Sequence, residues 1–348
     1  MRKIIVIQII ACTSLLLSSC EELIIETDEK NTPQNNFQLL WEDLDKHYAL
    51  FVSKKVDWDS LHKVYRPQVT SNTTEQQLWV IMTKMLNHLN DGHTTLENPE
   101  SQWSFESGDS LNLLAEEEFD IDLVQDKYLE YYSHTTEPSM SYGKIKDKDI
   151  GYIYMNSMTG LYPSRIDEIV DALQDHKAII FDIRNNGGGE DDYAHRIAGA
   201  FADGEHLVFT IQTRNGENYS DFDEKVEVFT KRVGDQQYLK PVIILTDRYV
   251  ASAAETFLLD MLSFQHIRQV GDTTAGDFSN VSNTRFLPNG WIYKYSHQLV
   301  LLPDGKNMDG VGIHPEVYIK NTKSDIDTDT DLVMNKAIDY LWEEYGIK

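Results

Sequence analysis

The stretch "PVIILTDRYVASAAETFLL", residues 241–259, places an apolar strand directly before a helix. A strand that leads through a short turn into a helix is typical of α/β proteins. Ser252 opens the helix, and serine is a common helix N-cap. A serine at such a junction is also in the position of a nucleophile elbow, although the Gly-x-Ser-x-Gly pattern is absent. The spacing within this stretch leaves both interpretations open.

The same alternation of strands and helices extends on both sides of this stretch and predicts a layered α/β core over residues 144–348. Its last strands are expected to be antiparallel and to meet at a turn within residues 289–302, before an amphipathic helix over 330–345. The other predicted strands are "IGYIYM" (150–155), "AIIFDI" (178–183) and "HIRQV" (266–270), and the other helices are "PSRIDEIVDAL" (163–173) and "DDYAHRIAGAF" (191–201).

Apolar residues recur at helical spacing from Phe37, which predicts a helical subdomain over residues 37–98. Its second helix has Asn72 or Thr73 as a cap, with Glu75 or Gln76 three residues later, and is expected to end at Gly92. Residues 99–143 are interpreted as a connector with short strands, at "FDIDLV" (119–124) and "YLEYYS" (128–133).

The first twenty residues, "MRKIIVIQIIACTSLLLSSC", have a basic start, an apolar run and small residues before Cys20. This pattern is typical of an export signal, and "LSSC" resembles the lipobox of bacterial lipoproteins, in which the cysteine is acylated. The alternative is an uncleaved anchor, which also places the rest of the chain outside the cytoplasm. We expect a lipid-anchored protein of the bacterial cell envelope, facing the periplasm or the cell surface, with residues 21–36 as a flexible tether.

The composition excludes some classes of partner. Fifty-seven acidic and 31 basic residues among 348 give a formal charge of −26, which argues against nucleic-acid binding. Both cysteines, Cys12 and Cys20, fall in the signal, so the mature protein has no internal disulfide and no cysteine-based metal site. No His, Asp and Glu spacing matches a metal motif, and no cofactor is expected.

Three consecutive glycines follow the predicted strand "AIIFDI", in "FDIRNNGGGE" (181–190). Ligands of open α/β sheets gather at the carboxyl ends of strands, and glycine allows the backbone to approach closely. The N–H groups of this run are candidates for an oxyanion hole. The alternatives are a tight strand-to-helix turn and a phosphate site, but the run lacks the lysine and spacing of a P-loop.

A serine nucleophile needs a base, and His93 is the candidate because it follows the predicted end of a helix in the short loop "DGHT". The alternative is that "NDGHT" only ends the helix. Asp309, in "MDGVGIHPEV" (308–317), is a candidate to orient an imidazole. Its alternative is an ordinary loop acid.

Five stretches resemble, in family order, the tail-specific (C-terminal processing) serine protease family: "LNDGHTTL" (89–96), "IIFDIRNNGGG" (179–189), "ILTDRYVASAAETFL" (244–258), "GDTTAG" (271–276) and "MDGVGIHPEV" (308–317). The resemblance is to the branch without a Ser–Lys dyad, which includes the core of tricorn protease and the repeats of interphotoreceptor retinoid-binding protein. It implies a Clp-protease/crotonase-like α/β core with an N-terminal helical subdomain.

The resemblance also implies roles. Ser252 matches the nucleophile, His93 the general base, and Gly188 with the N–H of Ala253 the oxyanion hole. Asp309 stands where that branch has an acid that supports the histidine, but it is one methylene shorter than glutamate. Where better-known members place a lysine, this chain has Asp277, and residues 99–143 leave no room for a PDZ domain.

The sequence therefore predicts a lipid-anchored serine endopeptidase that acts on a peptide or protein substrate. One rival is a lipoprotein that binds peptides or hydrophobic ligands on the same fold without catalysis, and another is a structural lipoprotein of a membrane complex. The presence of Ser252, His93 and Asp309 together favours the enzyme. The oligomeric state and the substrate are not predicted.

Overall fold

The computed structural model describes residues 30–108 and 118–348. The predicted signal, Cys20 and most of the predicted tether lie outside these residues. Among the described residues, no helix combines the length and the apolar character needed to cross a membrane.

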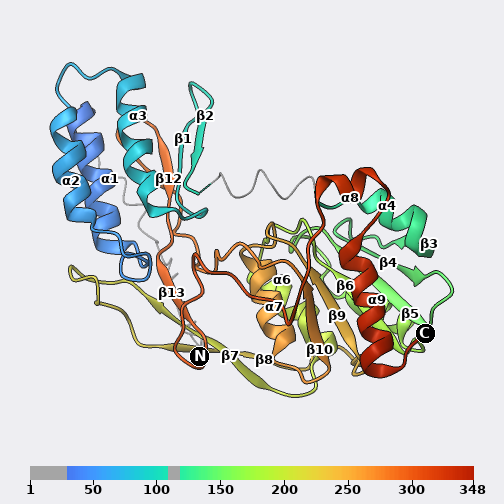
Figure 1. The fold of residues 1–348 in the computed structure, drawn as a ribbon. Coiled ribbons are helices and arrows are strands. Elements are labelled where there is room, and N and C mark those ends of the chain that lie inside the picture. The colour runs from blue at the N-terminus through green and yellow to red at the C-terminus, as the bar shows by residue number, and fades with distance from the viewer. Residues whose placement is uncertain (1–29, 109–117) are drawn as a thin grey trace, which may run out of the picture. The chain divides into compact units, whose positions relative to one another are not determined.

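A seven-stranded mixed sheet forms the centre of the α/β core (Figure 1). Strands β5, β6, β9, β10 and β14 run parallel to one another, and β3 and β4 add an antiparallel edge beyond β5. The strand order is β14 (Val317–Tyr318), β10 (Ile267–Gly271), β9 (Val242–Thr246), β6 (Ala178–Asp182), β5 (Ile150–Met155), β4 (Met140–Ile145) and β3 (Leu129–His134).

Helices cover both faces of this sheet, because its central strands are apolar on both sides. In β9, Val242 and Ile244 pack into one core, and Ile243 and Leu245 pack into the other. The helices that contribute to the first core are α5 (Arg165–Leu173), α6 (Asp191–Ala198) with η5 (Gly199–Phe201), and α7 (Ala253–Leu262). The second core contains α9 (Leu332–Tyr345), and the predicted layered α/β core is confirmed.

The helical region has its own core, centred on the fully buried Trp58. It also contains a four-stranded sheet, in which β12 pairs with β1 although about 200 residues separate them in the sequence. The elements are α1 (Pro33–His47), α2 (Trp58–Tyr65), η1 (Arg66–Gln68), α3 (Glu75–Leu86), η2 (Asn87–Leu89), β1 (Thr95–Asn98), β2 (Trp103–Glu106), β11 (Arg285–Phe286) and β12 (Ile292–Lys294).

Several helix ends differ from their predicted positions. Helix α1 begins at Pro33, inside the predicted tether, because the Thr32 side chain accepts a hydrogen bond from Asn35 N and caps it. The cap of α3 is Thr74, which forms a capping box with Gln77. After η2 the chain turns at Asn90, which has φ 46°, so the left-handed residue is Asn90 and not Gly92.

One predicted strand and one predicted strand pairing are wrong. Residues 121–128 form helical turns, α4 (Ile121–Leu123) and η4 (Val124–Tyr128), because Asp120 accepts hydrogen bonds from the backbone N–H groups of Asp122 and Leu123. Residues 289–302 do not form a hairpin, since β12 pairs with β1 and β13 (Gln298–Leu301) pairs with β7 (His206–Thr213). Strand β8 (Val226–Thr230) completes this third sheet, and α8 (Lys323–Asp327) precedes α9.

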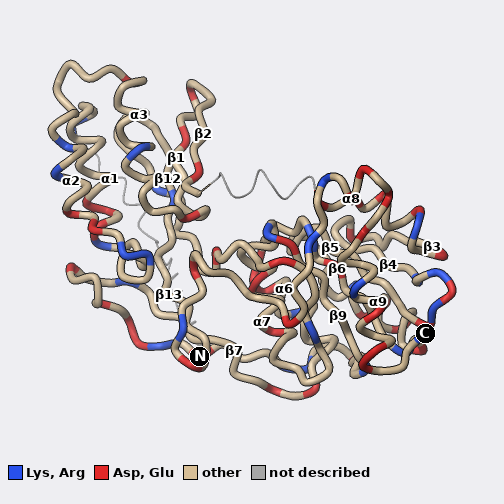
Figure 2. The backbone as a smooth tube through the Cα atoms, viewed as in Figure 1, with Lys and Arg blue, Asp and Glu red and all other residues tan. Residues whose placement is uncertain are grey.

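Charged residues are spread over the chain. Figure 2 shows that Lys and Arg occur both around α1–α3 and around the seven-stranded sheet, interspersed with Asp and Glu. Basic positions do not gather in one part of the backbone in this view, which agrees with the formal net charge of −26.

Candidate active site

The Gly-rich turn and the Ser252 turn leave the seven-stranded sheet at the same edge. Strands β6 and β9 are parallel neighbours, with Asp182 opposite Leu245, so the loops that follow them lie side by side. The backbone N–H of Ala251 donates to the carbonyl oxygen of Asn186 at 3.2 Å, which ties the two loops together. This is the edge at which open α/β sheets bind ligands.

Ser252 is the N-cap residue of α7, but its hydroxyl does not cap the helix. Its backbone has φ 55° and ψ −129°, a conformation that residues other than glycine rarely adopt. The side chain is half-buried. The helix has ten residues, and its N-terminus favours negative charge at the hydroxyl. The geometry therefore differs from an ordinary serine cap and has the strained turn of a nucleophile elbow.

Gly188 packs directly against Ser252. Its φ is 100°, and a Cβ atom there would lie 2.7 Å from Ser252 Cβ and 2.9 Å from Ala253 N. Only glycine fits at this distance. The chain thus brings Gly188, Ser252 and Ala253 together.

The two predicted oxyanion donors differ in their hydrogen bonds. As the first residue of α7, Ala253 has no acceptor within the helix for its N–H. The N–H of Gly188, in contrast, donates to Asn186 Oδ1 at 3.0 Å. An anion at this position must therefore replace Asn186 Oδ1 before Gly188 serves as a donor.

A buried carboxylate, Asp247, binds both the Gly-rich turn and the Ser252 turn. It accepts hydrogen bonds from Asn185 N at 2.9 Å and from Tyr249 N at 3.0 Å. Asn185 has φ 60°, so the bond supports a strained residue of the Gly-rich turn. Burial raises the pKa of Asp247 to about 7, and its hydrogen bonds and Arg184 oppose this rise.

His93 lies in the loop between η2 and β1, and Asp91 shapes that loop. The buried Asp91 carboxylate accepts hydrogen bonds from His93 N, Thr94 Oγ1 and Ser296 Oγ, at 3.2, 2.9 and 3.1 Å. The Nδ1 atom of His93 is buried and has no hydrogen-bond partner. The residue lines a cavity of about 390 Å³ with residues 281–284 and Lys294.

Asp309 is buried, and both of its oxygens bind groups other than His93. Oδ1 accepts from Phe278 N and Ser279 N, each at 3.0 Å, and Oδ2 accepts from Asn307 Nδ2 at 2.8 Å. Burial raises the pKa of Asp309 to about 6. Its contacts support a loop rather than an imidazole.

Glu255, in the first turn of α7, binds the same loop. It accepts hydrogen bonds from Thr274 Oγ1, from Gly276 N at 2.8 Å and from Asp277 N at 2.8 Å. Burial raises the pKa of Glu255 to about 8. The loop that follows β10 is thus joined to the helix that carries Ser252.

Among the hydrogen bonds of the described residues, none joins Ser252 to His93 and none joins His93 to Asp309. No sequence pattern singles out Asp91, Asp247 or Glu255 as functional residues. Position alone signals two of them, since Asp247 directly follows a buried strand and Glu255 lies in the first turn after Ser252. Their partners lie on other loops, so the sequence does not show which N–H groups they bind.

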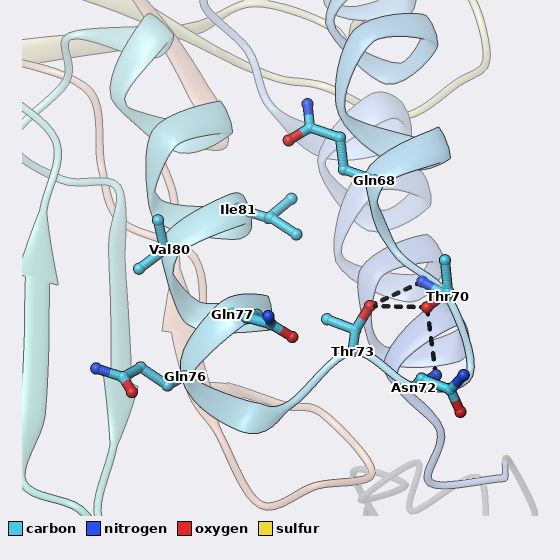
Figure 3. A pocket seen from close by; sticks show the side chains of 8 residues that line it. All are labelled: Gln68, Thr70, Asn72, Thr73, Gln76, Gln77, Val80 and Ile81. Atoms are coloured by element: carbon cyan, nitrogen blue, oxygen red, sulfur yellow. Dashed lines mark hydrogen bonds between the residues drawn. The ribbon is translucent and has the colours of Figure 1, made fainter.

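A larger cavity, of about 640 Å³, lies in the helical region and differs chemically from this site (Figure 3). Its lining comes from residues 68–81 and consists of glutamines, threonines, one asparagine and two aliphatic side chains. Thr73 Oγ1 there accepts a hydrogen bond from Thr70 N at 2.8 Å. None of these side chains titrates, so this cavity offers no acid–base chemistry. Within residues 30–108 and 118–348, no cluster of three or more His, Cys, Asp or Glu residues is placed to hold a metal.

Comparison with known families identifies the sheet that carries Ser252. Residues 149–319 match the model of peptidase family S41, and residues 29–87 match the C1 domain of tricorn protease. Residues 149–319 thus resemble a domain of peptidase family S41. The S41 match spans both turns at the sheet edge and the loops that carry Asp277 and Asp309, whereas His93 precedes it.

Relatives agree with this assignment. The carboxy-terminal processing protease CtpA of Bacillus subtilis is 26% identical over 178 residues, which are 51% of this chain and 36% of that protein. A candidate peptidase from Parabacteroides merdae has a crystal structure that matches with a TM-score of 0.81 at 29% identity, over 90% of this chain and 97% of the other. This chain thus spans little more than a third of the length of CtpA and nearly all of the structural relative.

The fold extends to more distant proteins. Mature CPAF matches with a TM-score of 0.69 at 12% identity, over 89% of this chain and 96% of the other, which is a likeness of fold alone. Together these structures confirm the predicted Clp-protease/crotonase-like α/β core with an N-terminal helical subdomain.

Proposed function

We propose that this protein is a serine endopeptidase that cleaves peptide or protein substrates with Ser252 as its nucleophile. The observation that carries the proposal is the backbone of Ser252. Its strained φ and ψ lift the hydroxyl out of the capping position at the N-terminus of α7, and Gly188 packs against it without a side chain. Strain of this kind persists where the surrounding structure fixes it for a function.

In the proposed reaction, Ser252 Oγ attacks the carbonyl carbon of the scissile peptide bond. His93 accepts the hydroxyl proton and later donates it to the leaving amine. Ala253 N–H donates to the oxyanion from the start of α7. Gly188 N–H becomes the second donor when the oxyanion replaces Asn186 Oδ1. Water then hydrolyses the acyl-enzyme with the same groups.

The proposal includes export and lipid attachment. The sequence of residues 1–20 supports a lipoprotein signal with acylation at Cys20, and this places the peptidase on a membrane surface in the cell envelope. Metabolic labelling of the full chain with an alkyne fatty acid tests this part. We expect the label in the wild type and none in Cys20→Ser, and equal label in both contradicts attachment at this residue.

A fluorophosphonate probe on the purified full-length chain tests the catalytic part. We expect covalent labelling of the wild type and none of Ser252→Ala, with a large loss in His93→Ala because the hydroxyl is then not activated. Ser263→Ala, at the other end of α7, and His314→Ala, on the exposed loop before β14, are the matched controls and should label like the wild type.

Cleavage of a peptide library by the same set of variants gives the second readout. A folded wild-type chain that neither labels nor cleaves would overturn the peptidase proposal and favour a binding protein on this fold. Labelling that persists in Ser252→Ala would show that another residue is the nucleophile.

A further inference from the structure

Asp277 is an acidic residue whose side chain reaches the loop of the candidate base. It lies on the loop between β10 and β11, 25 positions after Ser252, where better-known members of the family that the sequence resembles have a lysine. Both oxygens of Asp309 already accept hydrogen bonds from other groups. A different carboxylate is therefore needed to accept a hydrogen bond from the His93 ring.

The Asp277 carboxylate lies against the residue that precedes His93. Gly92 N donates to Asp277 Oδ1 at 3.4 Å, and a Cβ atom on Gly92 would lie 2.6 Å from Asp277 Oδ2. The carboxylate thus fills the space that a side chain at position 92 would need. It comes close to the His93 loop because position 92 is glycine.

Two other carboxylates fix the direction in which Asp277 points. Glu255 accepts from the N–H groups of Gly276 and Asp277, and Asp309 accepts from those of Phe278 and Ser279. Four consecutive backbone donors, 276 to 279, are therefore held by buried acids. Glu255 and Asp309 thus hold the backbone of this loop, whereas the Asp277 carboxylate is directed at Gly92 and accepts from its N–H through Oδ1.

The Nδ1 atom of His93 is buried and has no hydrogen-bond partner, so it is free to bond a nearby carboxylate. The charged groups around the pair are Asp91, Lys54 and Glu106. Burial raises the pKa of the Asp277 carboxyl, Asp91 adds to this rise, and the positive charges of His93 and Lys54 oppose it. The electrostatic interaction between Asp277 and His93 is therefore attractive when the imidazole is charged.

We propose that Asp277, rather than Asp309, is the carboxylate that pairs with the His93 imidazole. Asp277 acts as a positioning residue: it accepts the Nδ1–H, holds the tautomer in which Nε2 faces the nucleophile, and stabilises the imidazolium that forms during the reaction. Hydrogen bonds of this kind are often loose before substrate binds. The inference rests on the proposed function for its role, but the pairing itself has an independent test.

The independent test is the hydrogen bond at His93 Nδ1, measured by NMR of the histidine ring nitrogens and ring N–H protons in the full-length chain and assigned by comparison with His93→Ala. We expect Asp277→Asn to shift the Nδ1 signal, because the carboxylate that accepts the Nδ1–H is then an amide. Asp309→Asn is the matched variant and should shift this signal less. An unchanged signal in Asp277→Asn, or a larger shift in Asp309→Asn, would overturn the pairing whether or not the chain is an enzyme.

Kinetics test the role. We expect Asp277→Asn to lower kcat/KM by roughly 10²- to 10⁴-fold and to move the acidic limb of the pH–rate profile to lower pH. Gly92→Ala keeps both charged groups but pushes the carboxylate away, so it should also lower kcat/KM. Wild-type rates in a folded Asp277→Asn chain would refute the inference, while loss of labelling in Ser252→Ala would still support the peptidase.

Discussion

Gly188 lies against Ser252 at the edge of the seven-stranded sheet. A methyl group on Gly188 would stand 2.7 Å from Ser252 Cβ and 2.7 Å from the carbonyl oxygen of Ala251. One residue follows β6 and the other follows β9, and these strands are parallel neighbours. The sheet therefore determines how closely the glycine-rich turn approaches the candidate nucleophile.

Gly188→Ala should remove activity and destabilise the fold. The added methyl group meets atoms of three consecutive residues at a φ of 100°, so the two turns must separate. We expect a loss of at least about 2 kcal/mol in the free energy of unfolding by urea, with no fluorophosphonate labelling. Gly305→Ala is the control, because φ is similar at 83° and no atom lies within 4 Å. It should cost about 1 kcal/mol and leave labelling intact.

Ser252→Gly should make the protein more stable and inactive. Glycine adopts φ 55° and ψ −129° without the strain that serine has there, and the lost hydroxyl caps nothing. We expect a gain of about 1 kcal/mol in urea unfolding. Ser252→Ala keeps the strain and should be inactive without this gain. Equal stability of the two variants would show that the conformation is not strained.

The α/β core could be predicted from the sequence because its signals are local. Strands β6 and β9 are short apolar runs followed by helical patterns, so each element can be recognised from its own residues. The prediction failed where the partner is distant. Strand β12 pairs with β1, which lies far before it in the sequence, and nothing within residues 289–302 indicates that partner.

In the candidate site, too, the sequence predicts the local features but not the contacts between distant loops. Ser252 and Gly188 follow strands, so their position was predictable from the order of elements. The loop contacts were not predictable, since Glu255 binds Gly276 and Asp277 only once α7 and β10 lie side by side. Several acidic residues surround these loops, and sequence spacing does not show which of them faces His93.

Thr274→Val should disrupt the loop that carries Asp277. The buried Thr274 hydroxyl donates to Glu255 and accepts from Ile313 N at 2.7 Å, so valine leaves a carboxylate oxygen and an N–H without that partner. We expect a loss of about 2 kcal/mol in the free energy of unfolding and a reduced labelling rate. Thr273→Val is the matched control, because Thr273 bonds only the exposed His314 with its hydroxyl, and should change stability by less than about 1 kcal/mol.

Asp309→Asn should change how stability depends on pH. The pKa of Asp309 is raised to about 6 in the fold, mainly by burial, against about 3.9 in the unfolded chain. The folded state therefore binds the proton more tightly than the unfolded state does. The stability from this group is fully present below about pH 3.9 and is lost as the pH rises through about 6.

Asparagine does not titrate, so the Asp309→Asn variant lacks this loss. Between about pH 4 and pH 7 the free energy of unfolding of the wild type should fall relative to that of the variant by up to about 3 kcal/mol. Urea unfolding of both proteins at closely spaced pH values measures the difference. The amide oxygen of the variant can still accept from Phe278 N and Ser279 N, so both chains should fold over the whole range. Parallel stability curves would mean that Asp309 titrates alike in the folded and unfolded chain, and its burial against this loop would then have no electrostatic cost.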